Sequence, residues 1–190
     1  MIVSARKVLE LSKKYKLVEN LDAREKNPEG VGLDLRVGEV YKIGGKGFLG
    51  VTNRKTPNAE KVADIKKHKG PFTLKARGYI LIKTMEKINV PDKKIVVEEG
   101  KPPVYLMPYV YPRSTLQRSG ILLLATKTDP GYSGELTFGL ANLSSVDFEF
   151  ELGARLVNLV FEQVHGEISR PYKGQWKGGR VAAKKFERQI

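Results

Sequence analysis

The stretch PRSTLQRSGILLLATKTDPGYSGELTFGL, Pro112 to Leu140, contains two short strand-like runs separated by a turn. The runs GILLLAT and GELTFGL are apolar and are bounded by Gly and Pro. Between them, Asp129-Pro130-Gly131 is turn sequence, because Pro fixes φ and Gly permits a positive φ. The stretch therefore predicts two β-strands with a tight loop between them.

The same pattern of short β-rich runs and turn signals extends along most of the chain. Such a pattern predicts an all-β sandwich or jelly roll. An N-terminal exception is ARKVLELSKKYKL, which reads as an amphipathic helix with Ser4 as its N-cap. A lysine-rich stretch, residues 53–70, has weak helix propensity and is predicted to be an exposed insertion. The further strand-like runs are GLDLRVGEVYKI, PFTLKARGYILIKT, KIVVEE, PVYLMPYVY, VDFEFEL and ARLVNLVFEQV.

The composition excludes several kinds of site. The chain has no cysteine and only two histidines, which excludes disulfides, thiolate nucleophiles, cysteine-ligated zinc and histidine-rich metal centres. Thirty-four Lys and Arg against 21 Asp and Glu give a formal charge of +13, which favours a polyanionic partner or simply a solvated surface. No signal sequence and no membrane-length apolar run is visible, so we expect a cytoplasmic protein.

Two segments have the composition of chemical sites. RSTLQR offers Arg113 and Arg118 as bidentate phosphate donors, with the hydroxyls of Ser114 and Thr115 beside them. Asp129 is either a turn cap or a general base, and from its own segment the turn cap is favoured. An acid within an apolar run, at Asp34 in GLDLRVG, indicates a structural hydrogen bond or a ligand in a Mg²⁺ water shell.

The order of the motifs resembles that of the dCTP deaminase / dUTPase superfamily, closest to the archaeal dUTPases of the dCTP deaminase family. The motifs are GLDLRVG, FTLKARGYILIKTMEKINVP, PRSTLQRSGI, TDPGYSGELTFGLANL, GARLVNLVFEQV and YKGQWKGGRV. The resemblance implies a distorted jelly-roll β-barrel with an N-terminal helix, assembled as a homotrimer with active sites at the subunit interfaces. It also implies a single domain over residues 1–181 and a basic C-terminal tail over 182–190.

The resemblance further implies roles for individual residues. Asp129 matches the acid that activates water, Tyr132 the aromatic under the deoxyribose, and Asp34 the acid near a Mg²⁺ shell. The backbone near Ala125 and Thr126 matches the base-reading hairpin. Residues that match or replace the phosphate and tail contacts are Arg113, Ser114, Thr115, Arg118, Lys173, Lys177 and Trp176, and Trp176 either covers the base or packs the tail onto a neighbour.

Position 139 decides between two activities. Deaminases of this family need a glutamate on the strand after the turn, and Gly139 stands at that position. Glu135 lies four residues earlier, displaced by roughly 13 Å along the strand, beyond the ~3 Å reach of proton transfer. The sequence therefore predicts a dUTP diphosphatase that hydrolyses dUTP to dUMP and diphosphate with Mg²⁺, using Asp129, Arg118 and Ser114 as catalytic residues. The product dUMP would supply thymidylate synthesis, and loss of dUTP would limit uracil in DNA.

Three alternatives remain open on the sequence. The chain can be a dCTP deaminase, with or without diphosphatase activity, and release of ammonia from dCTP would identify it. It can be a non-catalytic nucleotide binder, an alternative that remains because the C-terminal motif YKGQWKGG departs from the family pattern. It can also be a nucleic-acid binder, for which salt-sensitive binding without turnover is expected.

Overall fold

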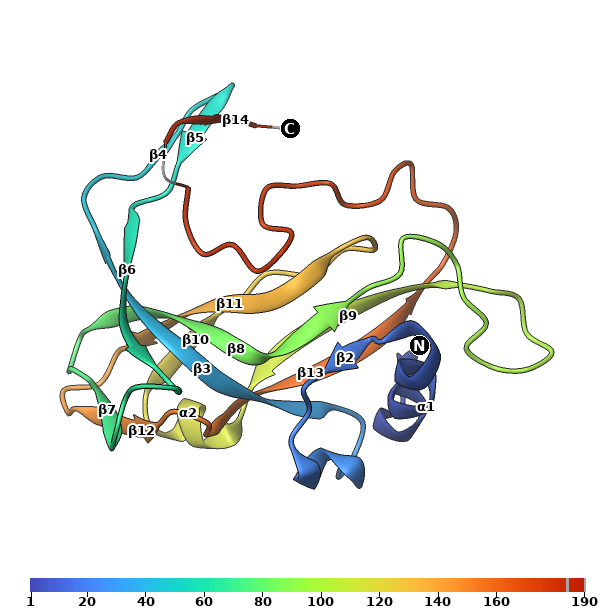
Figure 1. Ribbon diagram of the computed structural model, residues 1–190, viewed down its shortest axis with the longest axis horizontal. Helices are drawn as coiled ribbons and strands as arrows, with labels where there is room; N and C mark the ends of the chain where they lie inside the picture. Colours follow the sequence, from blue (N-terminus) through green and yellow to red (C-terminus); the bar gives the residue numbers. More distant parts are fainter. Residues whose placement is uncertain (184, 190) are drawn as a thin grey trace.

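The computed structural model describes residues 1–183 and 185–189, which are built mainly from β-strands (Figure 1). The predicted mainly β class is confirmed, and residues 184 and 190 of the predicted tail lie outside the described residues. In chain order the elements are β1 (Ile2–Val3), α1 (Ala5–Tyr15), β2 (Val18–Glu19), the 3₁₀ helix η1 (Ala23–Lys26), β3 (Leu33–Gly44), β4 (Phe48–Leu49), β5 (Asn53–Lys55), β6 (Asn58–Asp64), β7 (Pro71–Leu74), β8 (Tyr79–Asn89), β9 (Tyr105–Pro112), α2 (Ser114–Arg118), β10 (Ile121–Leu124), β11 (Ser133–Asn142), β12 (Phe148–Glu151), β13 (Arg155–Val164) and β14 (Glu187–Arg188).

The largest sheet is open and antiparallel. Its nine strands include the path β1-β13-β3-β8-β11-β10, while β2 pairs with β8, β6 with β3, and β9 with β13. The path ends at β10, so within the part of the chain that the structure describes the strands do not close on themselves. The expected closed jelly-roll barrel is therefore corrected to an open sheet in the single subunit.

The helix α1 forms where the sequence predicts it. The Ser4 side chain accepts a hydrogen bond from the backbone N–H of Lys7 at 3.3 Å, and Lys16, in the left-handed region, ends the helix. Val8 and Leu11 are buried against the sheet, and Leu17 follows them into the core. One apolar face thus attaches the helix to the sheet, and its lysines stay outside.

The loop between β10 and β11 is held from both sides. The Tyr132 N–H donates to the Asp129 carbonyl at 3.1 Å, and the Gly131 N–H donates to the Val90 carbonyl at 2.9 Å. Gly131 has a φ of +97°, and a Cβ there would stand 2.9 Å from the backbone nitrogen of Tyr172. Glycine is required at this turn because the C-terminal segment crosses it directly.

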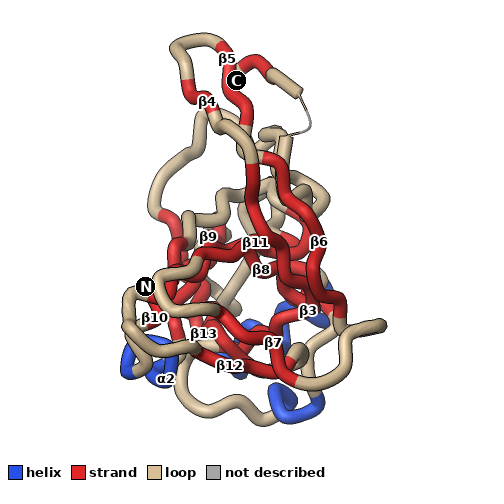
Figure 2. The backbone as a smooth tube through the Cα atoms, turned by 90° about the vertical axis from the view of Figure 1, so that its left-hand side faces the viewer, coloured by secondary structure: helices blue, strands red, loops and turns tan. Residues whose placement is uncertain are grey.

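Within the lysine-rich stretch, residues 53–55 and 58–64 are strands and residues 65–70 are turn and loop, so no helix forms there. β5 and β4 form the tip of an arm that extends from β3 and β6, and β14 adds a third strand there (Figure 2). The long strand β3 supplies the hydrogen-bonding edge that β6 pairs with, a tertiary effect that local composition does not reveal.

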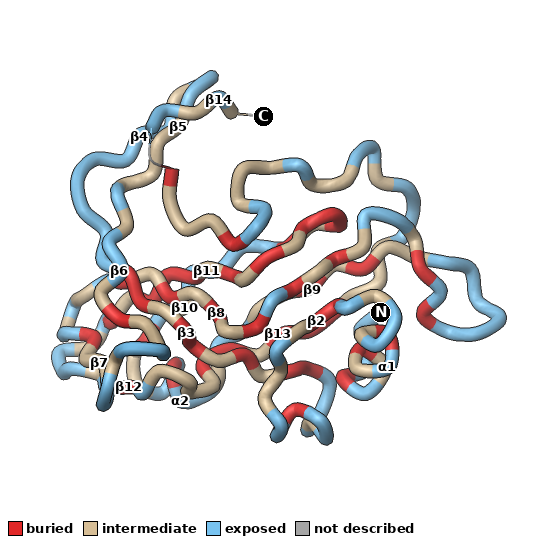
Figure 3. Tube along the Cα trace, viewed as in Figure 1, coloured by how far each residue is buried: buried red, intermediate tan, exposed pale blue. Residues whose placement is uncertain are grey.

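The C-terminal segment lies over β11 before it reaches that arm (Figure 1). Its N–H groups at Tyr172 and Gly178 donate to the carbonyls of Pro130 and Ser133, at 2.7 and 2.6 Å. Buried residues follow the central strands beneath it (Figure 3). Among the described residues, no helix has the length and apolar character needed to span a membrane.

Candidate active site

A pocket of about 570 Å³ lies between the β8–β11 face of the sheet and the C-terminal segment. We call it the aromatic pocket. Its lining combines the sheet, the loop before β11 and the C-terminal segment, which are remote in sequence. The lining residues are Ile43, Thr56, Pro57, Tyr79, Leu81, Thr126, Lys127, Thr128, Asp129, Tyr132, Leu136, Thr137, Phe138, Tyr172, Trp176, Arg180, Val181 and Ala182.

Asp129 supplies the carboxylate of this pocket. No other Asp or Glu lines it among the residues that the structure describes. The Lys127 ammonium donates to Asp129 Oδ1, and the side chain of Asp129 remains partly exposed. The carboxylate is thus both paired with a cation and open to a ligand or to water.

Tyr132 forms part of the wall. The residue is 8% exposed, and its hydroxyl donates to the Glu135 carbonyl at 2.6 Å. Burial, with smaller contributions from Tyr172 and Glu135, raises the pKa of Tyr132 to about 12. Its ring is therefore fixed and neutral, and it offers an apolar surface to whatever enters the pocket.

Contacts within the C-terminal segment position Trp176 at the pocket. Its backbone N–H donates to the Tyr172 hydroxyl at 3.2 Å, and the Arg180 guanidinium lies 5.9 Å from its ring centroid. The preceding residue, Gln175, accepts a hydrogen bond from Arg54 Nε at 2.9 Å. The C-terminal segment thus covers the pocket of the same subunit.

The remaining base and tail residues divide between two pockets. Thr126 lines the aromatic pocket, whereas Ala125 does not. Lys173 lines a neighbouring pocket of about 630 Å³ together with Arg54 and Arg170, and Lys177 lines neither of the two. The two pockets share Asp129, Tyr172 and Trp176, so they are adjacent.

The predicted phosphate motif lies elsewhere in the subunit. None of Arg113, Ser114, Thr115 and Arg118 lines either pocket, because α2 lies beneath the strands, away from the C-terminal segment (Figure 1). Arg113 instead donates to Asp34. The two groups of predicted site residues are therefore not brought together within this chain.

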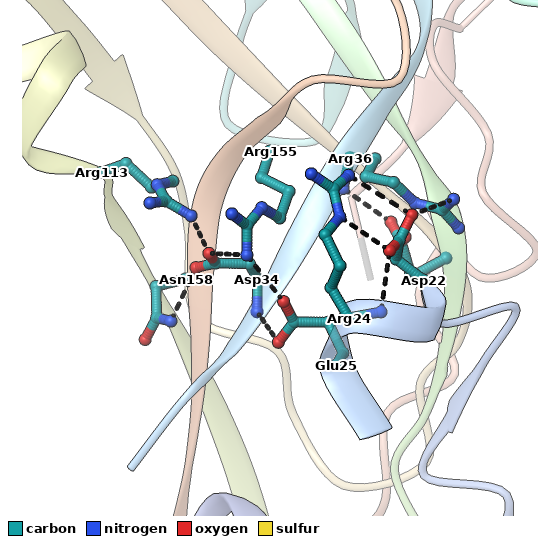
Figure 4. Close-up of polar contacts among 9 residues, drawn as sticks. Asp22, Arg24, Glu25, Asp34, Arg36, Arg113, Arg155 and Asn158 are labelled. Atoms are coloured by element: carbon teal, nitrogen blue, oxygen red, sulfur yellow. Dashed lines mark hydrogen bonds and ion pairs between the residues drawn. The ribbon is translucent and has the colours of Figure 1, made fainter. Parts of the chain in front are cut away.

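Asp34 is held by other side chains (Figure 4). Its Oδ2 pairs with Arg113 and with Arg155, the latter at 3.3 Å, and its Oδ1 accepts from Asn158 Nδ2 at 2.9 Å. Two guanidinium groups repel a cation, so these residues do not fit a Mg²⁺ ligand set. Nor do the described residues contain any group of three Asp, Glu, His or Cys side chains that could hold a metal. Of the two roles predicted for Asp34, a structural hydrogen bond or a ligand in a Mg²⁺ water shell, the structure shows the hydrogen bond.

A second ion pair, between Arg36 and the buried Glu86, lies near Asp34 and could not be predicted from the sequence. Arg36 Nε donates to Glu86 Oε1 at 2.6 Å, and Arg36 Nη1 donates to Asp22 Oδ2 at 3.1 Å. Burial raises the pKa of the Glu86 carboxyl, and its hydrogen bonds with Arg36 oppose that rise. Hydrogen bonds from Arg24 hold the pKa of Asp22 well below its usual range. These charges fix η1 against the sheet.

Gly139 lies on β11 between Leu124 of β10 and Leu81 of β8. A Cβ at this position would stand 2.9 Å from Cε2 of Tyr79, closer than real Cβ atoms approach. The Tyr79 ring therefore occupies the space that a side chain at position 139 would need. This relationship was not foreseen from the sequence, because it depends on the register of β8 against β11.

Comparisons with known proteins give one family. The family model described as dCTP deaminase-like matches residues 2–164. A dCTP deaminase of Thermococcus kodakarensis is 29% identical over 159 residues, covering 84% of both chains. A "dCTP deaminase, dUMP-forming" of Persephonella marina is 32% identical over 186 residues, covering 95% of this chain and 93% of the relative.

Among solved structures, a 2'-deoxycytidine 5'-triphosphate deaminase from Agrobacterium tumefaciens shares the fold, with a TM-score of 0.61 and 15% identity. The alignment covers 86% of this chain and 48% of that one, so the chain spans about half of its length.

These relatives overturn the predicted activity. They are named dCTP deaminases, in some cases dUMP-forming, so the prediction of a dUTP diphosphatase is wrong. The alternative of a dCTP deaminase agrees better with them. The inference from Gly139 gave one residue too much weight, since a reaction can draw its proton-transfer group from another segment.

Proposed function

The chain belongs to the dCTP deaminase-like family, and on that premise we propose that it is an enzyme that deaminates dCTP in the aromatic pocket. The observation that carries the proposal is the pocket itself. It combines stacking surfaces from Tyr132 and Trp176 with the carboxylate of Asp129 and the hydroxyl of Thr126. A pyrimidine nucleotide offers the matching features, namely an aromatic base and a sugar with polar edges.

Hydrolytic deamination requires one proton-transfer group close to the base. Water adds at C4 of cytosine and ammonia leaves, which converts dCTP to a deoxyuridine nucleotide. A carboxylate can take the proton of the water and deliver it to the departing nitrogen. Asp129 is the group we propose for this role, because it is the carboxylate that faces the pocket.

The triphosphate needs cations from two sources. In the same chain, Arg54, Arg170 and Lys173 line the adjacent second pocket. We propose that Arg113 and Arg118, with Ser114 and Thr115, reach the phosphates from a neighbouring subunit of a homotrimer. The exposed leucines 122 and 124 on the edge strand β10 are consistent with a surface covered by assembly.

A second candidate is binding of the nucleotide without deamination. One observation favours it: the position of Gly139 in the β8–β11 face carries no carboxylate, and Tyr79 fills that space. Under this alternative the pocket would hold dCTP and leave it unchanged.

Incubation with dCTP tests the proposal, with ammonia and the nucleotide product measured separately, with and without magnesium. We expect ammonia and a deoxyuridine nucleotide in equal amounts, and chromatography identifies the product as dUTP or dUMP. Saturable binding of dCTP without ammonia would support the second candidate. Absence of both binding and ammonia would contradict both.

A further inference from the structure

One wall of the aromatic pocket is formed by β8 and β11. In the ladder, Tyr79 stands opposite Ala141 and Leu81 stands opposite Gly139. The Tyr79 ring leans diagonally over the glycine, with its Cε2 and Cζ 2.9 and 3.0 Å from the Cβ that position 139 lacks. The glycine therefore allows a tyrosine from the adjacent strand to line the pocket.

Two hydroxyl groups in this region have no partner in the protein. Thr137 Oγ1 is buried and makes no hydrogen bond, and the hydrogen bonds of the described residues include none to Tyr79 Oη. Both residues line the pocket beside Leu81, Leu136 and Phe138. The unsatisfied buried hydroxyl of Thr137 is unfavourable, and the Tyr79 hydroxyl belongs to a residue that is 39% exposed, so a ligand in the pocket can pair with both.

We propose that Tyr79 is a base-contacting residue whose hydroxyl contacts the C4 edge of the pyrimidine, with Thr137 beside it. The inference rests on the proposed function, because it takes the base of a pyrimidine nucleotide as the occupant. A phenol both donates and accepts hydrogen bonds. It therefore pairs with the 4-amino group of cytosine as acceptor and with the 4-oxo group of uracil as donor.

The protonation state supports both modes of pairing. Burial raises the pKa of Tyr79, so its hydroxyl remains protonated near neutral pH. A carboxylate in the same place would only accept, and it would favour cytosine over uracil. The tyrosine thus makes substrate and deaminated product bind with comparable affinity.

Substitution of the hydroxyl alone gives the first test. Tyr79→Phe keeps the ring over Gly139, and it should weaken binding of dCTP and dUTP alike, by about 5- to 10-fold for one lost hydrogen bond. Tyr15→Phe, on α1 and outside the pocket, is the matched control and should leave both affinities unchanged. If the native protein binds both nucleotides and Tyr79→Phe binds them as tightly, the inference is overturned while the proposed function stands. If the native protein binds neither, the proposed function fails, and the inference fails with it.

Substitution at positions 79 and 139 together gives the second test. Gly139→Glu alone should lose nucleotide affinity, because its Cβ overlaps the Tyr79 ring. The double variant Tyr79→Ala/Gly139→Glu has room for the carboxylate, and we expect its preference for dCTP over dUTP to rise at least about tenfold. Circular dichroism confirms that each variant is folded. An unchanged preference in a folded double variant that binds dCTP would contradict the placement of Tyr79 at the C4 edge.

Discussion

The guanidinium of Arg113 donates to the carboxylate of Asp34, a contact between the residue before α2 and strand β3. Asp34 also pairs with Arg155 and accepts from Asn158, so three donors surround one carboxylate. Only Nη1 of Arg113 is used in this pair, and its other guanidinium nitrogens make no hydrogen bond with a described residue. Asp34 therefore orients Arg113 without consuming its capacity to bind an anion.

That orientation leads to a prediction about assembly. If α2 serves the pocket of a neighbouring subunit, Asp129→Asn and Arg118→Ala should each be inactive alone, yet recover activity in mixed oligomers. Random co-assembly of equal amounts should restore about a quarter of native activity in the unfractionated mixture and about a third in trimers that contain both variants, since one site in three of a mixed trimer has both halves intact. Co-expression with two different tags and purification through both isolates the mixed oligomers. Mixed oligomers without activity would place both halves of the site in one subunit.

Asp129 should be required for turnover but not for binding. Asp129→Asn keeps the size and polarity of the side chain and removes its capacity to accept a proton. We expect kcat for ammonia release to fall by about 10²- to 10⁴-fold, with KM changed far less. The exposed Asp92, outside the pocket, is the control position, and Asp92→Asn should retain native kcat. Near-native kcat in Asp129→Asn would exclude the residue as the proton-transfer group.

The pair Arg36–Glu86 should be a major contributor to stability. Glu86 is 0% exposed, and Arg36 donates to both of its carboxylate oxygens. Arg36→Ala leaves that carboxylate buried without its cation, and the free energy of unfolding should fall by about 3–5 kcal/mol. Arg24→Ala removes an exposed partner of Asp22 and should cost much less. Urea unfolding measures both, and equal losses would contradict the importance of burial.

The pH dependence of stability should include a contribution from Asp22. The hydrogen bonds from Arg24 lower the pKa of Asp22 in the folded protein below its usual value of 3.8. In acid, the unfolded protein therefore binds a proton that the folded protein does not. The stabilisation by Asp22 is fully present above its usual pKa and is lost as the pH falls through the lowered pKa. Between about pH 5 and pH 2, Asp22→Asn should lose less stability than the native protein, whereas Asp92→Asn should match the native protein. An acid-induced loss in Asp22→Asn as large as the native one would contradict the role of the carboxylate.

Local patterns in the sequence identify the elements whose signals are short-range. The helix α1, the strands on both sides of the Asp129 turn, and the motif residues Tyr132 and Trp176 are all visible in it. The pocket gathers Asp129, Tyr132 and Trp176, because the C-terminal segment returns across the turn at Gly131. Turn residues such as Pro130 and Gly131 carry a local sequence signal, which makes them recognisable, although long-range contacts also hold this loop.

The remaining features depend on pairing between distant strands. Tyr79 reaches Gly139 only because β8 and β11 adopt one particular register, and Arg36 reaches Glu86 across β3 and β8 for the same reason. Periodicity says which side of a strand a residue faces, but not which residue stands opposite it. The lysine-rich segment was misread for a related reason, since β6 is a strand only when β3 lies beside it.

Proton NMR of dCTP incubated with the protein tests the central claim most directly, because the H5 and H6 signals distinguish cytosine from uracil. We predict that the cytosine signals of dCTP decline while uracil signals grow in equal amount, with ammonium released in step. Cytosine signals that persist unchanged through prolonged incubation with native protein would contradict deamination. If these signals of dCTP also show no line broadening in the presence of the protein, the pocket would be excluded as a dCTP site as well.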